Sequence, residues 1–409
     1  MGVQIDRIGR DIDVINTFNA TPGKGITRFT FSEPYMQARA YVSDELRKAG
    51  ARVSTTLGGN LSGRLEGSAG GLPSVMTGSH IDSVLHGGRF DGVAGVVAAL
   101  EVVRVMAEQK IPHRHPVDVV VFAEEEGSRF GSVMIGSRAW IGKLGPDDLH
   151  RLMDKDGTSF AAAMADAGLL PEDTTLLKPG MAKAMIELHI EQSLVLERKG
   201  IPIGVVEGIN GIKQFVVTLT GVANHAGATP MGLRQDALQG AARVIAAVEE
   251  IAMGAISGNT VATVGMLTCE PGQANVIPGR VQFTLDIRDL DSGRIDQASR
   301  RIASAIETTC QARDLAFDIQ PRSDTPPVRL SKHVVQLIEA TAREKGIKTM
   351  RMASGALHDS SILPDVTEVG MIFVPSKGGR SHCPEEDTSL ADLQKGAELL
   401  LAAVAKLAN

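Results

Sequence analysis

Runs of apolar residues alternate with helical patterns along most of this chain. Four runs rich in Val, Ile, Met and Phe predict buried strands, at 73–80, 116–123, 184–190 and 370–375. Apolar residues recur at helical spacing in segments outside these runs, most clearly over 92–109 and also over 33–50. Strands that are apolar throughout and separated by helices predict an α/β fold, with a mostly parallel sheet flanked by helices.

The middle of the chain has a different pattern, in the order β-α-β-β-α-β. The strands are expected at 213–221, 259–269, 280–290 and 315–321, and the helices at about 233–252 and 293–313. This is the split-βαβ order of ferredoxin-like domains. We therefore expect a discontinuous main domain, residues 1–212 and 327–409, and an inserted domain, residues 213–326.

The pattern predicts little for residues 145–180 but predicts a long helix at the end of the chain. Residues 145–180 are rich in Asp, Gly and Pro with one short helix, and the pattern assigns them no role. The last helix is expected to begin at Ser389, which forms a capping-box-like start with Asp392.

Composition narrows the possible classes of protein. The 409 residues exceed one ordinary domain, and 43% hydrophobic with 22% charged residues is typical of a soluble globular protein. A net charge of -6 argues against a nucleic-acid surface. No apolar run approaches the ~20 residues that span a membrane, and the first residues lack the apolar stretch of a secretory signal. Three widely spaced cysteines form no disulfide framework, so we expect a cytoplasmic protein.

Acidic and histidine side chains follow the predicted strands at their carboxyl ends. Carboxyl ends of parallel strands share one edge of a sheet, so these residues can converge although they lie far apart in the sequence. Crowded carboxylates do not all ionise unless a cation neutralises them, and imidazole with carboxylate is the ligand set of zinc, manganese, cobalt or nickel. A shared carboxylate would give the two-metal arrangement of hydrolases. The residues concerned are His80, Asp82, Asp91, Glu124, Glu125, Glu126, His189, Glu191 and His382.

Most of these residues also have an ordinary structural explanation. A lone histidine such as His80 is more often structural than a ligand, but Asp82 follows it closely and could orient its ring. A run of glutamates is usually a solvated face, but this one ends a fully apolar strand. His189 alone could be a satisfied core residue, and His358-Asp359 stays ambiguous.

The inserted domain carries its own candidates. His225 lies between small residues in a predicted loop, which indicates an exposed functional side chain. Asn275 and Arg288 could bind a ligand, because an arginine at a strand end can hold a carboxylate with two hydrogen bonds. The alternative for Arg288 is a salt bridge to Asp286 or Asp289.

A series of motifs now becomes recognisable in this order along nearly the whole chain: GSHIDSVLHGGRFDGVAG, AEEEGSRFG, ELHIEQ, NHAGATPM, NVIPG, LDIR, SGALHD and SHCPEE. Together they resemble the hydantoinase/carbamoylase branch of the two-metal amidohydrolases, which is related to aminoacylase and carboxypeptidase G. That branch contains N-carbamoyl-L-amino-acid hydrolases, allantoate amidohydrolases and beta-ureidopropionases.

The resemblance implies two divalent metal ions in each subunit, of Zn²⁺, Mn²⁺, Co²⁺ or Ni²⁺. The implied ligands of the first ion are His80, Asp91 and His189. The implied ligands of the second are Asp91, Glu126 and His382, so that Asp91 bridges the two.

The resemblance also assigns roles around the metals. Glu125 matches the general base, which moves a proton from the attacking water to the leaving amine. The inserted domain would be a lid through which two copies form a homodimer. His225 would stabilise the oxyanion, and Asn275 and Arg288 would hold the substrate carboxylate, with Gln192 nearby.

The chain departs from the family pattern near the expected substrate pocket. Ser193 follows Gln192 where relatives usually have glycine, and a usual Gln-Arg pair is replaced in the stretch that contains Gln214. Leu357 stands where glycine is expected. Gln214 and Leu357 are therefore further candidates for substrate binding.

The resemblance predicts hydrolysis of the linear ureido C–N bond of an N-carbamoyl-L-amino acid, giving the amino acid, CO₂ and ammonia. One alternative is an allantoate amidohydrolase, and another is an N-acyl amino-acid hydrolase or dipeptidase. A metal-free binding protein of the same fold is a further alternative, but it predicts a broken set of ligands, whereas every implied ligand and Glu125 are present.

Overall fold

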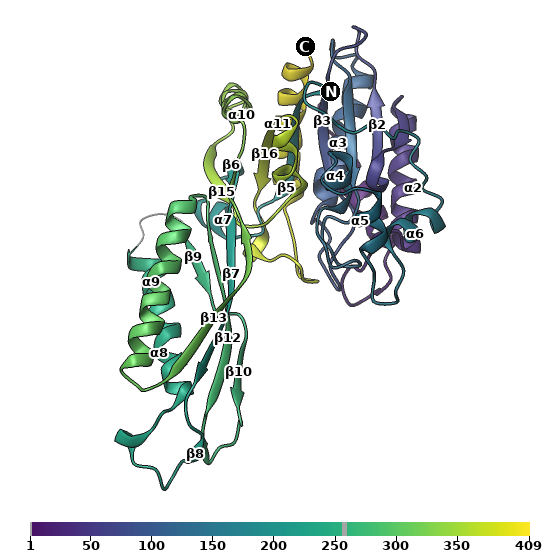
Figure 1. The fold of residues 1–409 in the computed structure, drawn as a ribbon. Helices are drawn as coiled ribbons and strands as arrows, with labels where there is room; N and C mark the ends of the chain where they lie inside the picture. Colours follow the sequence, from purple (N-terminus) through teal and green to yellow (C-terminus); the bar gives the residue numbers. More distant parts are fainter. Residues whose placement is uncertain (1, 256–259) are drawn as a thin grey trace. The chain divides into compact units, whose positions relative to one another are not determined.

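The computed structural model describes residues 2–255 and 260–409. The chain divides into two compact units, one of Met1–Glu207 with Leu330–Asn409 and one of Gly208–Arg329 (Figure 1). These bounds lie a few residues from those expected near 212 and 327. Within the described residues, no helix is both long and apolar enough to cross a membrane.

The first unit is built on a sheet of nine strands. Along its main path the order is β1-β2-β4-β3-β5-β16-β6-β14, and β15 pairs with β6 beside this path. The strands are β1 (Arg52–Thr55), β2 (Leu61–Leu65), β3 (Ser74–His80), β4 (Val117–Phe122), β5 (Ala182–Ile190), β6 (Ile203–Ile209), β14 (Val328–Arg329), β15 (Thr349–Ser354) and β16 (Glu368–Val374).

The sheet is mixed, with fewer parallel pairs than the apolar pattern indicated. The central strands β4, β3, β5 and β16 run parallel, whereas β1, β2, β6 and β14 pair antiparallel with their neighbours. The short connection between β1 and β2 cannot hold the crossover that a parallel pair requires, so these strands form a hairpin. The four predicted strands are the four parallel ones, and they lie where both faces of the sheet are covered.

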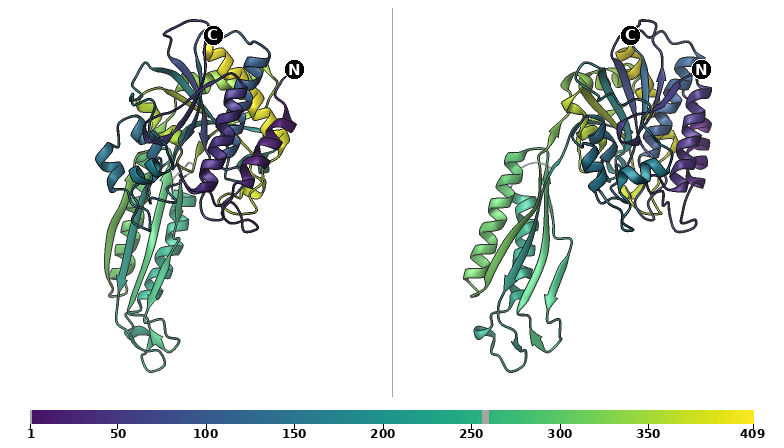
Figure 2. Two further views of the ribbon diagram at one scale, coloured as in Figure 1. Left: turned by 90° about the vertical axis from the view of Figure 1, so that its right-hand side faces the viewer. Right: turned by 45° about the vertical axis from the view of Figure 1, so that its right-hand side comes forward.

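Helices cover one face of this sheet as a continuous layer (Figure 2). This layer contains α2 (Glu33–Lys48), α3 (Val93–Glu108), α10 (Lys332–Glu344) and α11 (Leu390–Ala408), and α1 (Ile5–Thr17) packs against α3 and α11. Helix α3 is buried on nearly all sides, because the sheet and three helices surround it. Ser389 is the N-cap of α11, but its side chain makes no capping hydrogen bond, so the expected capping box is not formed.

The segment 145–180 contains two short helices and no long element. They are α5 (Pro146–Arg151) and α6 (Phe160–Asp166), and they follow α4 (Ile135–Trp140). Trp140, Asp173 and Leu177 line a small cavity together with side chains of β1, β2, β3 and β4. This segment therefore packs beside these strands of the sheet. Farther along the chain, the short helix α7 (Val195–Lys199) follows β5.

The second unit has a five-stranded antiparallel sheet with the order β10-β12-β7-β13, and β9 also pairs with β12. Two helices line one face of this sheet over an apolar core (Figure 2). Strand β12 alternates buried and half-buried side chains. Its elements are β7 (Gly211–Thr220), α8 (Ala237–Glu250), β9 (Val261–Thr263), β10 (Leu267–Glu270), β12 (Arg280–Asp289), α9 (Ser292–Gln311) and β13 (Ala316–Thr325).

The β-α-β-β-α-β order is present, with one difference from the expected strands. The strand expected at 259–269 is divided into β9 and β10, and its first residue lies outside the described part of the chain. Two short strands, β8 (Asn224–His225) and β11 (Val276–Ile277), pair with each other apart from the main sheet.

Candidate metal centre

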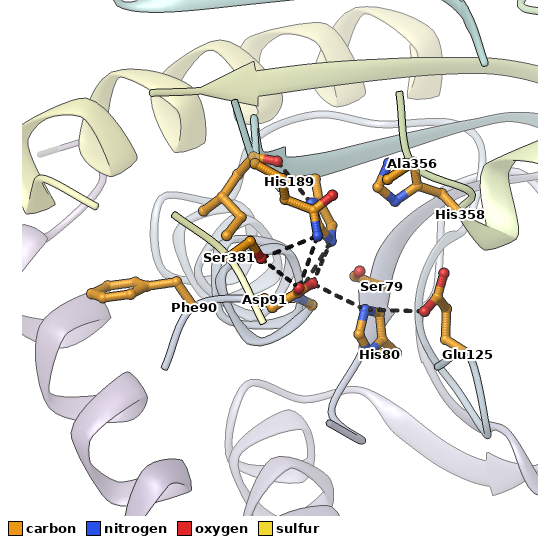
Figure 3. Close-up of polar contacts among 12 residues, drawn as sticks. Ser79, His80, Phe90, Asp91, Glu125, His189, Ala356, His358 and Ser381 are labelled. Atoms are coloured by element: carbon orange, nitrogen blue, oxygen red, sulfur yellow. Dashed lines mark hydrogen bonds and ion pairs between the residues drawn. The ribbon is translucent and has the colours of Figure 1, made fainter. Parts of the chain in front are cut away.

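The parallel strands bring distant residues of the chain to one edge of the first unit (Figure 3). His80 is the last residue of β3, Glu125 and Glu126 follow β4, and His189 lies near the end of β5. His382 lies in the loop that joins β16 to α11. The carboxyl ends of β3, β4, β5 and β16 therefore supply the centre, as expected for an α/β sheet.

His80, Asp91 and His189 form the first group that could hold a metal ion, and all three are buried. The Nε2 atom of His189 lies 3.2 Å from Asp91 Oδ1, and the Nε2 atom of His80 lies 3.6 Å from the same oxygen. Two imidazole nitrogens and one carboxylate oxygen thus face a common point, which suits a transition metal or zinc.

Asp91, Glu126 and His382 form the second such group. The Nε2 atom of His382 lies 3.1 Å from Asp91 Oδ2 and 3.4 Å from Glu126 Oε2. The His382 side chain is 48% exposed, so this group opens to solvent. Asp91 uses a different oxygen in each group, which is the arrangement of a carboxylate shared between two ions.

The far nitrogens of the two buried imidazoles have carbonyl partners. The Nδ1 atom of His80 lies 3.1 Å from the Asp82 carbonyl oxygen, and that of His189 lies 2.9 Å from the Ile190 carbonyl oxygen. A carbonyl only accepts, so each Nδ1 carries the proton and donates it. Each Nε2 atom faces Asp91 and would offer its lone pair to a metal, and the carbonyl at Nδ1 is the usual outer support of a histidine ligand.

The crowded acids and imidazoles of the centre shift one another's pKa values. Burial alone would lower the pKa of His80, but Glu125 and Asp82 outweigh it and raise that pKa well above its usual value. Burial alone would raise the pKa of Asp91, but His189 and His382 hold it well below its usual value. A bound cation would take the place of the protons on these imidazoles.

The pKa values of the neighbouring acids are raised, as expected for carboxyl groups that are buried close together. Burial, with the Asp91 carboxylate, raises the pKa of Glu126 to about 7. Burial raises the pKa of Glu125 well above its usual value, and Glu126 adds to this effect against an opposing contribution of His80. Among the described residues, Glu126 Oε1 and Asp82 Oδ1 are buried without a hydrogen-bond partner. The donor set and these oxygens therefore fit a pair of divalent ions.

Glu125 lies beside the ligand groups and belongs to neither of them. Its Oε2 atom is 3.7 Å from His80 Nε2. The preceding Glu124 has a different function, because its Oε1 accepts the backbone N–H groups of Arg129 and Phe130 and so shapes the following loop. Glu124 thus supports the loop, Glu125 is an acid outside the two ligand groups, and Glu126 is a candidate ligand.

Backbone conformation is unusual at three positions around the centre. Glu124, Gln192 and His382 all adopt left-handed φ values between 54° and 58°. Such conformations are costly for residues other than glycine and gather at functional sites.

Two predicted substrate residues lie in the first unit. The Nε2 group of Gln192 donates to Asp91 Oδ2 at 2.8 Å and contacts Ser381 Oγ at 3.3 Å, so Gln192 touches the candidate centre directly. Leu357 is half-buried in the loop after β15, next to the buried His358.

His358, which was ambiguous from the sequence, packs against the centre. Its ring lies 4.5 Å from the His189 ring, and its Nε2 lies 2.9 Å from Ser354 Oγ. Burial and the neighbouring His189 lower the pKa of His358 far below its usual value. His358 is therefore a neutral side chain that supports His189.

The other predicted substrate residues lie at two ends of the second unit. Arg288 pairs in register with Ile212, whereas Arg280, at the far end of β12, pairs with Thr220. His225 lies beside Val276 in the short strand pair that precedes β12, next to Asn275. Since Arg280 and Arg288 are eight residues apart on β12, these ends are roughly 27 Å apart.

Asn275 and Arg288 of one copy therefore lie far apart, and the expectation that both hold the substrate carboxylate stays a prediction. Arg288 pairs with Asp286, through Nε to Oδ1 at 2.8 Å and through a terminal nitrogen to Oδ2 at 3.2 Å. Gln214 also donates to Asp286, at 2.8 Å. The salt bridge considered from the sequence is therefore present.

Comparisons with known proteins agree with this geometry. Residues 76–406 match the model of peptidase family M20/M25/M40. The chain is 42% identical to the N-carbamoyl-L-amino acid amidohydrolase of Geobacillus stearothermophilus over 409 residues, which is 100% of this chain and 99% of the relative. It is 35% identical to the allantoate amidohydrolase of Escherichia coli (strain K12), over 96% of each chain.

Solved structures lead to the same assignment. A hydantoinase/carbamoylase family amidase from Burkholderia multivorans superposes with a TM-score of 0.96 at 33% identity, over 100% of this chain and 98% of that one. The resemblance inferred from the motifs is confirmed. This chain belongs to peptidase family M20/M25/M40 and groups there with the hydantoinase/carbamoylase amidases.

Proposed function

We propose that the protein hydrolyses the ureido C–N bond of N-carbamoyl-L-amino acids to the amino acid, CO₂ and ammonia. The observation that carries this proposal is the convergence of two possible ligand groups on the shared Asp91, with the acid Glu125 beside them. Full-length similarity to an N-carbamoyl-L-amino acid amidohydrolase supports the choice of substrate class.

Two divalent ions would be held by the two groups described above. The mixed nitrogen and oxygen donors suit Zn²⁺, Mn²⁺, Co²⁺ or Ni²⁺. When bound, such ions lower the pKa of water and polarise the substrate carbonyl.

Glu125 would be the general base. Its carboxylate would accept a proton from the water that attacks the ureido carbon, and would return that proton to the nitrogen that leaves as the C–N bond breaks. Its burial supports this role, because an acid whose pKa is raised holds a proton more readily between the two transfers.

His225 would donate a hydrogen bond to the oxygen that becomes negative. Its Nδ1 atom accepts the backbone N–H groups of Gly227 and Ala228, each at 3.1 Å. With Nδ1 accepting, the proton of the neutral ring resides on Nε2, which leaves an exposed N–H donor. Such a donor suits an oxyanion.

Arg288 and Asn275 would both recognise the substrate carboxylate, with Gln192, Gln214 and Leu357 around the rest of the molecule. Because Arg288 and Asn275 lie at opposite ends of the second unit, they can reach one substrate only if they belong to different copies. This supports a homodimer that forms through the second unit, which would act as a lid. We also place the protein in the cytoplasm, where its three free cysteines would stay reduced.

A second candidate is an allantoate amidohydrolase. Similarity to the Escherichia coli enzyme favours it, and so does the Gln192 amide beside Asp91, since a diureido acid needs additional polar contacts.

Ammonia release from a panel of N-carbamoyl-L-amino acids and allantoate would test the proposal. The protein would first be saturated with each of the four candidate metals. We expect turnover with at least one N-carbamoyl-L-amino acid and less with allantoate. Preference for allantoate would establish the second candidate, and no ammonia from any ureido acid would contradict both.

A further inference from the structure

Glu386 lies where two loops of the candidate metal centre meet. It follows His382 in the loop after β16 and is only 2% exposed. Its Oε1 atom accepts the backbone N–H groups of Phe90 at 2.8 Å and of Asp91 at 3.0 Å. Its Oε2 atom accepts the Ser381 hydroxyl at 2.8 Å. Both oxygens are therefore used within the protein.

These bonds join the two loops that carry most of the second ligand group. Asp91 precedes α3 and His382 follows β16, so no strand holds either of them. The first group differs, because His80 and His189 lie on β3 and β5, where neighbouring strands fix the backbone. The geometry of the second group thus depends on contacts between loops, and Glu386 provides three of them.

We propose that Glu386 is a positioning residue, which holds Asp91 and His382 at the spacing that the second metal ion requires without binding that ion itself. This inference rests on the two-metal function proposed above. In agreement with it, Glu386 belongs to none of the described residue groups that could hold a metal. Glu386 is the last residue of the SHCPEE motif, but it also lies among the acids of a PEED stretch that looks like surface, so the sequence alone does not predict this role.

A glutamine at position 386 distinguishes an effect of the hydrogen bonds of Glu386 from an effect of its negative charge. In Glu386→Gln, the amide oxygen can still accept both backbone N–H groups. The amide N–H₂ would face Ser381 Oγ, whose proton can turn to Asp91 Oδ2 at 3.0 Å. Glu386→Ala removes all three contacts. If Glu386 acted only through its negative charge, both variants would weaken metal binding equally.

The test uses full-length protein that has been stripped of metal with a chelator. Its binding of Co²⁺ is measured by calorimetry and by visible absorption. The wild type should bind two ions. Glu386→Ala should weaken the second ion roughly tenfold to a hundredfold, as for other residues that orient ligands. The first ion should be weakened less, because Asp91 is only one of its ligands and His80 and His189 are held by strands. Glu386→Gln should bind both almost as the wild type does.

The neighbouring Glu385 provides a matched control. It is exposed and pairs with Arg380 at 3.5 Å, so Glu385→Gln should change neither ion. If Glu386→Ala does not fold, Glu386→Asp, with a carboxylate one methylene shorter, should show the same selective loss.

The outcomes are distinct. Unchanged binding of both ions in Glu386→Ala, or in Glu386→Asp where that variant replaces it, would overturn the inference. A Gln variant as weak as the Ala variant would also overturn it, because charge would then be the cause. A wild type that binds fewer than two ions would overturn the two-metal function itself.

Discussion

Asp359 shows how burial, with neighbouring acids, can fix the protonation of a carboxyl group behind the candidate centre. Burial raises its pKa to about 8, against the effect of the Ser137 hydroxyl, which donates to Oδ1. Its Oδ2 atom has no hydrogen-bond partner among the described residues. At neutral pH the metal-free folded protein therefore holds Asp359 mainly as a neutral acid, whereas the unfolded chain ionises it.

This difference predicts a pH-dependent gain in stability for Asp359→Asn. The folded state binds the proton more tightly, so the wild type loses stability as the pH rises from about 4 to about 8, and the Asn variant does not. At pH 8 the variant should be more stable by more than about 1 kcal/mol, since one pKa unit corresponds to about 1.4 kcal/mol. Denaturant unfolding of chelator-treated protein at pH 5, 6.5 and 8 would measure it. Parallel pH curves for the two proteins would contradict the prediction.

Other single residues show which part of the site was predictable. His80, Asp91, Glu126, His189 and His382 stand out because acids and histidines at or after the carboxyl ends of apolar strands have few structural reasons to be there. Glu386 does not stand out, because its burial arises from a loop that folds back onto another loop. No local pattern in a sequence records such a contact.

At the scale of elements, the start of α3 leaves no room for a side chain beside the candidate centre. Gly92 is its N-cap, with φ 64°, and an added Cβ would lie 2.5 Å from the His80 ring. The glycine therefore lets the helix begin directly after Asp91 while the His80 imidazole stays in place.

Gly92→Ala should displace His80 and weaken metal binding, and it should also destabilise the fold by about 1 kcal/mol or more through backbone strain. Gly50→Ala is the matched control, because Gly50 also has a positive φ of 86° but an added Cβ meets nothing within 4 Å. It should lower stability without changing the metal content per chain. Equal metal content in both variants would refute the proposed role of Gly92.

The strands that could be predicted from the sequence are those buried on both faces of the sheet. Strands β3, β4, β5 and β16 were predicted because they are apolar on both faces. The strands β1, β2, β14 and β15 were missed because they are short or only partly buried, and β6 was missed although it is mostly buried. These missed strands are the ones that make the sheet mixed.

At the scale of the whole molecule, the proposed function would need two copies of the chain for a complete site. Arg288 and His225 lie at opposite ends of the second unit, so one substrate would need Arg288 from one copy and His225 from its partner. Isologous dimers, in which each copy serves the other, satisfy this requirement twice.

Co-expression of Arg288→Ala with His225→Ala chains tests this arrangement. Each variant alone should be nearly inactive, because loss of one oxyanion donor costs about 10²- to 10³-fold in kcat and loss of Arg288 weakens carboxylate binding. Random pairing should restore about a quarter of wild-type activity, since half of the dimers would be mixed and each would hold one intact site. Pairing Glu125→Gln with either variant shows which residue crosses to the partner. A mixture no more active than its parents would contradict shared sites.

The central claim is that Glu125 moves protons beside a two-metal centre and is not itself a ligand. Glu125→Gln tests it most directly, by metal content per chain and ammonia release from an N-carbamoyl-L-amino acid in the same preparation. We predict two bound ions in both the wild type and the variant, with turnover in the variant lower by about 10²- to 10⁴-fold. Loss of an ion in Glu125→Gln, or turnover close to that of the wild type, would contradict the account.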